Sequence, residues 1–286
     1  MLKTSPIQGT FGIRVEGLNL SEPLETDPLK ELFGLFHEHQ VMVIPDQSLT
    51  PEQFLVFGSN FGRPHPHVIQ RARMKGYPAL MTITNKMKDD SHPKQGAAHW
   101  YTDQSYEEDP ASATILYSIE APETGGETLF ADMFQAYDDL PDKMKSRIEG
   151  LRAKHVYGTG VAARKDDYDP GALGSQEEKD SIPMIDHLLA RPHPVTGRTA
   201  LYSPAGTSQG IVGMEDGEAA KLLNELADHA LQPKYVYKHK WAVGDVVGWD
   251  TSSTMHAATP IGAATGPKDT RLLYRISVKG KPGIYS

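Results

Sequence analysis

The sequence contains no cysteine. This absence excludes disulfide bridges, thiolate-bound metals and cysteine nucleophiles, and it is typical of a cytoplasmic protein. Any transition-metal site must therefore use histidine, aspartate, glutamate or tyrosine. No segment approaches the roughly 18 apolar residues that a membrane helix requires. The first residues, Met1-Leu2-Lys3-Thr4-Ser5-Pro6, contain no apolar signal core, so we expect a cytoplasmic protein without a membrane anchor.

Basic residues are fewer than acidic residues. The 29 lysines and arginines are outnumbered by 37 aspartates and glutamates, which gives a net charge of −8 at pH 7. A general nucleic-acid binder needs a basic surface that neutralises phosphates. The acidic balance therefore predicts no nucleic-acid partner.

Glycine and proline are frequent, with 26 and 21 residues spread over a chain of 286, and they favour short strands joined by turns. Apolar spacing predicts helices from an N-cap at Asp27, from a capping box at Thr50, over 133–151 with a break near Pro141, and over 215–231. Strands are predicted at 41–44, 80–83, 113–119, 127–131, 199–203, 235–241, 245–249 and 271–278. Because strands and helices do not alternate strictly, we expect one β-rich α+β domain over 1–286, a sandwich or barrel with helices outside.

One segment does not fit this pattern. Residues 157–185 are polar, glycine-rich and charged. A long irregular insertion in a compact domain is usually an active-site lid or a surface loop, and these residues do not decide between the two.

The first candidate site is His99-Trp100-Tyr101-Thr102-Asp103. Alternate side chains of a strand share a face, so His99, Tyr101 and Asp103 are expected to point the same way. Tyr101 and Asp103, two residues apart, could then share one metal ion. His99 would lie roughly 13 Å from Asp103 along an extended strand and could join them only through a bulge. The alternative is a surface strand that carries an aromatic residue and an acid.

Three further segments place polar residues beside apolar strands: His256 after 245–249, Thr128 after a Gly125-Gly126 turn, and Arg271 with Arg275 on one strand face. Two arginines on one face need anionic partners. Structural carboxylates or bound ones could supply them, since the planar guanidinium pairs well with either. Taken alone, each segment also has a structural explanation: a hydrogen-bonded histidine, a hairpin entry and structural ion pairs.

Together and in this order, the motifs resemble the taurine dioxygenase and 2,4-dichlorophenoxyacetate dioxygenase family of Fe(II)/2-oxoglutarate oxygenases. The resemblance covers nearly the whole chain and rests on Gly17-Leu18-Asn19-Leu20, Val41–Ile44 with Pro45-Asp46-Gln47, Phe61-Gly62, Trp100-Tyr101-Thr102-Asp103, Gly125-Gly126-Glu127-Thr128, His193-Pro194-Val195-Thr196-Gly197-Arg198, Trp249-Asp250, His256, and Arg271 with Arg275. It implies a double-stranded β-helix (jelly-roll) core with flanking helices. It also implies an Fe(II) centre of two histidines and one carboxylate, with open positions for 2-oxoglutarate and O2.

The resemblance implies roles for individual residues. Asp103 matches the carboxylate ligand of the metal and His256 matches the distal histidine ligand. Thr128 and Arg271 match the residues that hold the far carboxylate of 2-oxoglutarate. On this basis Asp103, His256 and Arg271 form the catalytic set.

The resemblance also implies a small anionic organic substrate, such as a carboxylate, sulfonate or phosphonate. Arg275 matches the residue that pairs with the anionic group of the substrate, and His67 matches, more loosely, a substrate-contacting histidine. Hydroxylation next to a heteroatom would lead to cleavage of the carbon–heteroatom bond. Similar enzymes often form dimers or tetramers, so a homo-oligomer is in keeping with the family.

The chain departs from the family's Trp-His-x-Asp motif, because Tyr101 stands where the first histidine ligand is expected. A neutral phenol binds Fe(II) weakly, whereas a phenolate favours Fe(III). Three interpretations follow. Tyr101 ligates an altered metal centre; or His99 or water takes its place; or the substitution weakens or abolishes iron binding. We favour the first, because the position aligns without a gap.

Two other classes of function compete with the oxygenase. One is a pseudoenzyme that binds an anion without redox turnover, and Tyr101 is its main support. The other is a metal-dependent hydrolase or isomerase, which would have no need for Thr128 with Arg271. A second departure, the lack of a polar asparagine in Gln95-Gly96-Ala97-Ala98-His99, argues against taurine itself as the substrate.

Overall fold

The computed structural model describes residues 1–7, 11–68, 70–86, 99–157 and 182–283, so the predicted insertion at 157–185 lies almost entirely outside the described residues. The helices are α1 (Thr26–His39), α2 (Pro51–Ser59), α3 (Met133–Asp138), α4 (Asp142–Ile148) and α6 (Asp216–Ala230), with 3-10 turns η1 (Gln70–Ala72) and η3 (Pro233–Tyr235). The strands are β1 (Lys3–Pro6), β2 (Ile13–Glu16), β3 (Val41–Ile44), β4 (Arg63–Pro64), β5 (Arg73–Met74), β6 (Tyr77–Thr84), β7 (Ala113–Glu120), β8 (Thr128–Asp132), β9 (Arg152–His155), β10 (Ile185–Leu188), β11 (Ala190–Pro192), β12 (Thr199–Leu201), β13 (Ser208–Ile211), β14 (Val236–His239), β15 (Val246–Asp250), β16 (Thr254–Ala258) and β17 (Leu272–Lys279). Within these described ranges, no helix has the length and apolar character needed to cross a membrane.

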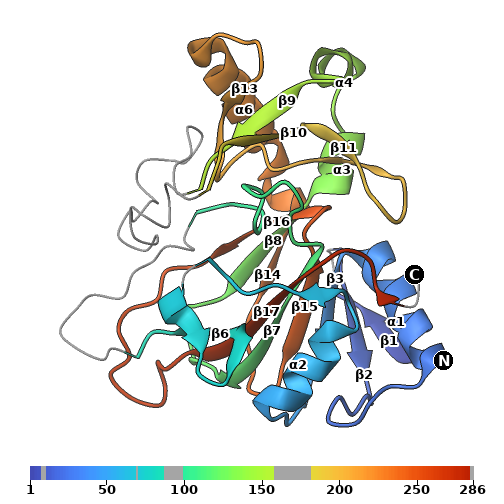
Figure 1. The fold of residues 1–286 in the computed structure, drawn as a ribbon, viewed down its shortest axis with the longest axis vertical. Helices are drawn as coiled ribbons and strands as arrows, with labels where there is room; N and C mark the ends of the chain where they lie inside the picture. Colours follow the sequence, from blue (N-terminus) through green and yellow to red (C-terminus); the bar gives the residue numbers. More distant parts are fainter. Residues whose placement is uncertain (8–10, 69, 87–98, 158–181, 284–286) are drawn as a thin grey trace.

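Two sheets packed against each other form the centre of the molecule (Figure 1). The larger has nine strands in the order β1-β2-β3-β15-β7-β17-β6-β5, with β4 paired to β17, and the smaller has the order β14-β8-β16. The central strands β15, β7 and β17 pair antiparallel. The chain therefore folds as the predicted double-stranded β-helix.

Alternation along the strands explains why the sheets pack. In β15, Val247 and Trp249 point between the two sheets, whereas Val246 faces the helices on the outer side. Successive side chains of a strand point to opposite faces, so an apolar run can supply both cores. The core between the sheets consists of Val41, Val43, Leu116, Phe130, Trp241, Val247, Trp249 and Leu273. Burial of each such large side chain stabilises the fold by about 1.5–3 kcal/mol.

Helices α1 and α2 cover the outer face of the larger sheet (Figure 1). The predicted apolar stripe of α1 is buried there, and the capping box at Thr50 is present at the start of α2. The predicted N-cap of α1 was wrong: the helix begins at Thr26 after Glu25, which makes no side-chain cap. Asp27 lies instead in the first turn, where its charge favours the helix dipole.

A second group of elements lies at one end of the sheets, in the upper part of Figure 1. It contains α3, α4, α6 and the short strands β9 to β13, packed around a separate apolar core. The predicted helix at 215–231 is α6, and its inward side chains include Leu222, Leu223 and Leu226. The loop between β11 and β12 returns from this group toward β15, where it meets the end of α1.

Candidate active site

Tyr101 and Asp103 reach the site on an irregular segment, so the prediction that they lie on a regular strand was wrong. Only Tyr101 pairs as a strand residue. Its N–H donates to His256 O at 3.0 Å, and its carbonyl accepts from the His256 N–H at 2.9 Å. Thr102 then donates its hydroxyl to Thr254 O at 3.3 Å, and Asp103 lies in a turn. This single bridge is what places Tyr101 beside His256.

Asp103 and His256 face each other inside the protein. Asp103 Oδ2 lies 3.7 Å from His256 Nε2 and has no hydrogen-bond partner among the described residues. This distance is too long for a hydrogen bond. It is short enough for one ion to bind both atoms, since metal bonds to nitrogen and oxygen are about 2.0–2.2 Å long. The two donors therefore fit a divalent metal ion.

The charges of both groups suit metal binding. Burial lowers the pKa of His256 to about 4, so the imidazole is neutral at pH 7 and retains a lone pair for a metal. Burial alone would raise the pKa of Asp103, but the charges of Arg275 and His256 lower it overall. The carboxylate therefore stays ionised at neutral pH.

A cavity opens beside His256. Its lining consists of Ile83, Tyr101, Leu116, Thr128, Trp249, His256, Ala258, Arg271, Leu273 and Arg275. The prediction that Arg271, Leu273 and Arg275 share one face is confirmed, because all three line this cavity. The structure thus brings the predicted ligand His256 together with the predicted anion-binding residues.

Arg271 brings a buried positive charge to this cavity, and no carboxylate in the described ranges pairs with it. The residue is 9% exposed, its Nη1 donates to Gly126 O at 3.0 Å, and its Nε has no partner among the described residues. Burial lowers its pKa. Thr128 Oγ1 accepts from Trp241 Nε1 at 3.1 Å, which leaves the Thr128 hydroxyl proton available to another acceptor. A bound carboxylate would offset the free-energy cost of burying this guanidinium.

Arg275, in contrast, already has an anionic partner. Its Nη2 donates to Asp103 Oδ1 at 2.8 Å and to Ser277 Oγ at 3.1 Å. This contact holds one carboxylate oxygen and leaves the other directed at His256. His67 lies within the field of the same pair: burial is the main cause that lowers its pKa to about 3, followed by the charge of Arg275. The pKa of His67 is therefore sensitive to the charge of Arg275, the other predicted substrate-binding residue.

The Tyr101 phenol lies close to two imidazoles. Its ring centroid is 4.3 Å from that of His256 and 5.1 Å from that of His99. Burial and the negative charge of Asp103 raise the pKa of Tyr101, so the metal-free protein holds a neutral phenol there. A Cβ added at Gly206 would lie 2.7 Å from Tyr101 Cβ, so the Gly206 backbone packs closely against the backbone of Tyr101.

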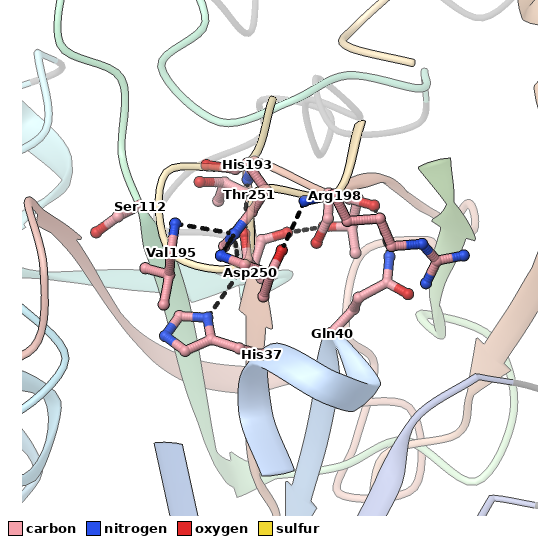
Figure 2. Close-up of polar contacts among 12 residues, drawn as sticks. His37, Gln40, Ser112, His193, Val195, Arg198, Asp250 and Thr251 are labelled. Carbon is pink, nitrogen blue, oxygen red and sulfur yellow. Dashed lines mark hydrogen bonds and ion pairs between the residues drawn. The ribbon is translucent and has the colours of Figure 1, made fainter. Parts of the chain in front are cut away.

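A second cluster of polar side chains lies on the other face of β15 (Figure 2). Asp250 Oδ2 is 2.8 Å from His193 Nε2 and 3.1 Å from His37 Nδ1. Among the described residues, these three offer metal-ligating atoms within 4.8 Å of one another. The motifs that contain His193 and Asp250 are recognisable in the sequence, but without a role. His37, in the last turn of α1, gives no local signal.

Hydrogen bonds fix the tautomer of His193 and argue against a metal in this second cluster. His193 Nδ1 accepts from the backbone N–H groups of Val195 at 3.2 Å and Thr196 at 3.0 Å. Nδ1 therefore carries no proton, and Nε2–H is the donor to Asp250. A metal on Nε2 would require the opposite tautomer, with Nδ1–H directed at two other N–H groups. The pair Asp103 and His256 is therefore the better metal site.

We expect the Asp250 cluster to stabilise the fold near neutral pH and to lose this contribution in acid. Burial alone would raise the pKa of Asp250, but hydrogen bonds from His193 and His37 lower it from 3.8 to about 2. The stabilisation, about 2 kcal/mol, is therefore complete above about pH 5 and disappears as the pH falls toward about 2. Chemical denaturation of the wild type and Asp250→Asn across this pH range should show that the difference between their free energies of unfolding shrinks in acid. If the difference in unfolding free energy stayed constant with pH, the ionised Asp250 carboxylate would not be the source of this stabilisation.

Known proteins share both the sequence pattern and the architecture. Residues 3–277 match the family described as "Taurine catabolism dioxygenase TauD, TfdA family". An alpha-ketoglutarate-dependent 2,4-dichlorophenoxyacetate dioxygenase from Cupriavidus pinatubonensis is 32% identical over 264 residues, which cover 88% of this chain and 90% of that protein. An alpha-ketoglutarate-dependent sulfate ester dioxygenase from Pseudomonas putida is 26% identical over 285 residues, which cover 98% and 90%. The crystal structure of AAD-2 in complex with Mn(II) and N-oxalylglycine is 32% identical, covers 98% of this chain and 97% of that chain, and gives a TM-score of 0.79.

Proposed function

Since the chain belongs to the taurine catabolism dioxygenase TauD, TfdA family and is an alpha-ketoglutarate-dependent dioxygenase, we propose that it hydroxylates a small organic anion at the Asp103–His256 site. Its cofactors are Fe(II) and 2-oxoglutarate, with O2 as the oxidant. When bound, they supply the oxidation of an unactivated C–H bond, and 2-oxoglutarate leaves as succinate and CO2. Asp103 and His256 would hold the metal.

The buried guanidinium of Arg271, which has no carboxylate partner among the described residues, is the observation that carries this proposal. It lines one cavity with His256, and His256 lies 3.7 Å from the carboxylate of Asp103. A dicarboxylate that reaches the metal with one end would meet Arg271 with the other. Arg271 and Thr128 would then bind the far carboxylate and fix the orientation of the cosubstrate.

The substrate would be an anion bound by Arg275 beside the metal. One terminal nitrogen of Arg275 is held by Asp103, whereas Nη1 has the Met81 sulfur as its contact, at 3.9 Å. Nη1 could therefore donate to a substrate without releasing Asp103, and the neutral imidazole of His67 would supply a second contact. Two relatives named above, acting on 2,4-dichlorophenoxyacetate and on sulfate esters, have anionic substrates. A carboxylate, sulfonate or phosphonate, with cleavage of a carbon–heteroatom bond after hydroxylation, fits this site.

An anion-binding pseudoenzyme is the alternative, and the neutral phenol of Tyr101 favours it. With a weak third ligand, Asp103 and His256 would have to retain the metal by themselves. In that case Arg271 would still bind a dicarboxylate, but no substrate would be oxidised.

Succinate release distinguishes the two proposals. We expect the protein with Fe(II), 2-oxoglutarate and O2 to form succinate, and faster when a panel of aryloxyacetates, sulfonates and phosphonates is added. Asp103→Asn preserves the size of the side chain but removes the anionic ligand, and it should lower the rate at least about 100-fold. Succinate formation that is absent in the wild type, with dicarboxylate binding intact, would establish the pseudoenzyme.

A further inference from the structure

We propose that Asp250 is a positioning residue, which fixes the buried turn between β15 and β16 and thereby aims His256 at Asp103. The proposal rests on the proposed function only in so far as His256 is the metal ligand. Asp250 ends β15, the turn covers residues 251–253, and His256 is the third residue of β16. The other two members of the cluster, His37 and His193, come from distant segments.

The Asp250 carboxylate binds three N–H donors. Oδ2 accepts from His193 Nε2 and His37 Nδ1, and Oδ1 accepts from the backbone N–H of Ser252 at 2.8 Å. The first two bonds tie the end of β15 to α1 and to the β11–β12 loop, and the third shapes the turn itself. Charge-assisted hydrogen bonds of this kind are stronger than neutral ones and directional.

Polar contacts also hold the rest of the turn. Thr251, Ser252, Ser253 and Thr254 are all buried. Gln40 anchors the turn from the end of α1, because its carbonyl accepts from the Asp250 N–H at 2.9 Å and its Nε2 donates to Ser253 O at 2.8 Å (Figure 2). Loss of any of these hydrogen bonds would leave a buried polar group unmatched, which is costly.

Within the described part of the chain, no hydrogen bond orients the ring of His256. Its Nδ1 has no partner among the described residues, although a metal-binding histidine usually donates its second N–H to an acceptor. The ring is instead held by its neighbours, with centroids 4.3 Å from Tyr101 and 4.8 Å from Trp249. Trp249 directly precedes Asp250, and Tyr101 is paired to the His256 backbone. The orientation of the imidazole therefore follows from the placement of β15 and β16, which Asp250 sets.

Asp250→Asn tests this proposal, with Asp245→Asn as the matched control. Asp245 is also a buried aspartate paired to a histidine, at 3.2 Å from His239 Nε2, but it precedes the opposite end of β15. We expect Asp250→Asn to weaken Mn(II) binding about tenfold. It should also speed amide hydrogen exchange of Tyr101 and His256 about tenfold, since their reciprocal hydrogen bonds would loosen. Asp245→Asn should lower the melting temperature without either effect.

A milder variant keeps the test decisive if Asp250→Asn fails to fold. His37→Asn removes one of the two imidazoles that donate to Asp250, and the His37 side chain is 11% exposed. It should weaken Mn(II) binding and speed the exchange of the two amides severalfold, less than Asp250→Asn does. Folded variants with wild-type exchange and wild-type Mn(II) affinity would overturn the proposal. If the wild type binds no Mn(II), the proposed function fails, whereas the exchange of the two amides still decides the positioning role.

Discussion

Replacing Arg271 by alanine should weaken the binding of 2-oxoglutarate about 100-fold while leaving the ligand-free protein at least as stable as the wild type. Loss of one partner from a buried charge pair costs about 2–5 kcal/mol of binding free energy. The ligand-free protein has no such pair to lose, because the guanidinium is buried without a carboxylate among the described residues. Removal of a charge that is buried and unpaired relieves a cost of desolvation.

Calorimetric titration of 2-oxoglutarate in the presence of Mn(II), together with thermal unfolding, measures both halves of this prediction. Arg271→Lys should bind with intermediate affinity, since it keeps the charge but loses the planar fork. Arg147→Ala is the control, because Arg147 is 41% exposed and pairs with Glu218 and Glu225 on the surface. If Arg271→Ala bound 2-oxoglutarate with the affinity of the wild type, Arg271 would not be part of the 2-oxoglutarate site.

The elements that the sequence predicts well are those whose pattern is local. Strand β15 is a continuous apolar run, and its alternation places Trp249 between the sheets as expected. The same rule predicts that Arg271, directly before β17, and Arg275 share one face, and both line one cavity. Strands such as β9 (Arg152–His155) were not predicted, because their residues carry no apolar alternation and their order comes from pairing with β10 and β13. Pairing energy of that kind depends on segments far away in the sequence.

The candidate site also combines features that local sequence patterns predict with features that depend on distant segments. The residues of the metal and anion sites could be selected from motifs, but their contacts could not. Asp103 and Arg275 are 172 residues apart, and their ion pair joins the irregular 101–103 segment to β17. His37 and Asp250 are 213 residues apart, and no spacing rule relates a helix end to a strand end at that distance. Local periodicity therefore assigns candidates to faces, whereas the fold decides which of them touch.

Replacing Tyr101 by histidine should raise the affinity for Fe(II) at least about tenfold. The phenol of the wild type is neutral, because burial and the charge of Asp103 raise its pKa, and a neutral phenol is a poor ligand for Fe(II). An imidazole at this position would complete a set of two histidines and one carboxylate around Asp103 and His256. Anaerobic Fe(II) titration, followed by the visible absorption of the complex with 2-oxoglutarate, measures the change. Mn(II) binding gives a second measure that does not depend on oxygen.

Three outcomes separate the roles that Tyr101 could have. If Tyr101 is a defect in the ligand set, Tyr101→His should bind Fe(II) more tightly and form succinate faster. If His99 ligates in its place, His99→Ala should weaken Fe(II) binding in the wild type, since its ring lies 5.1 Å from that of Tyr101. If Tyr101 is a working ligand, its phenolate should give the oxidised protein a visible absorption band, and Tyr101→His should abolish the band and slow turnover. The last result corresponds to the interpretation that the ungapped alignment favours. It would contradict the prediction made from the structure, because it requires bound iron to overcome the burial that keeps the phenol protonated.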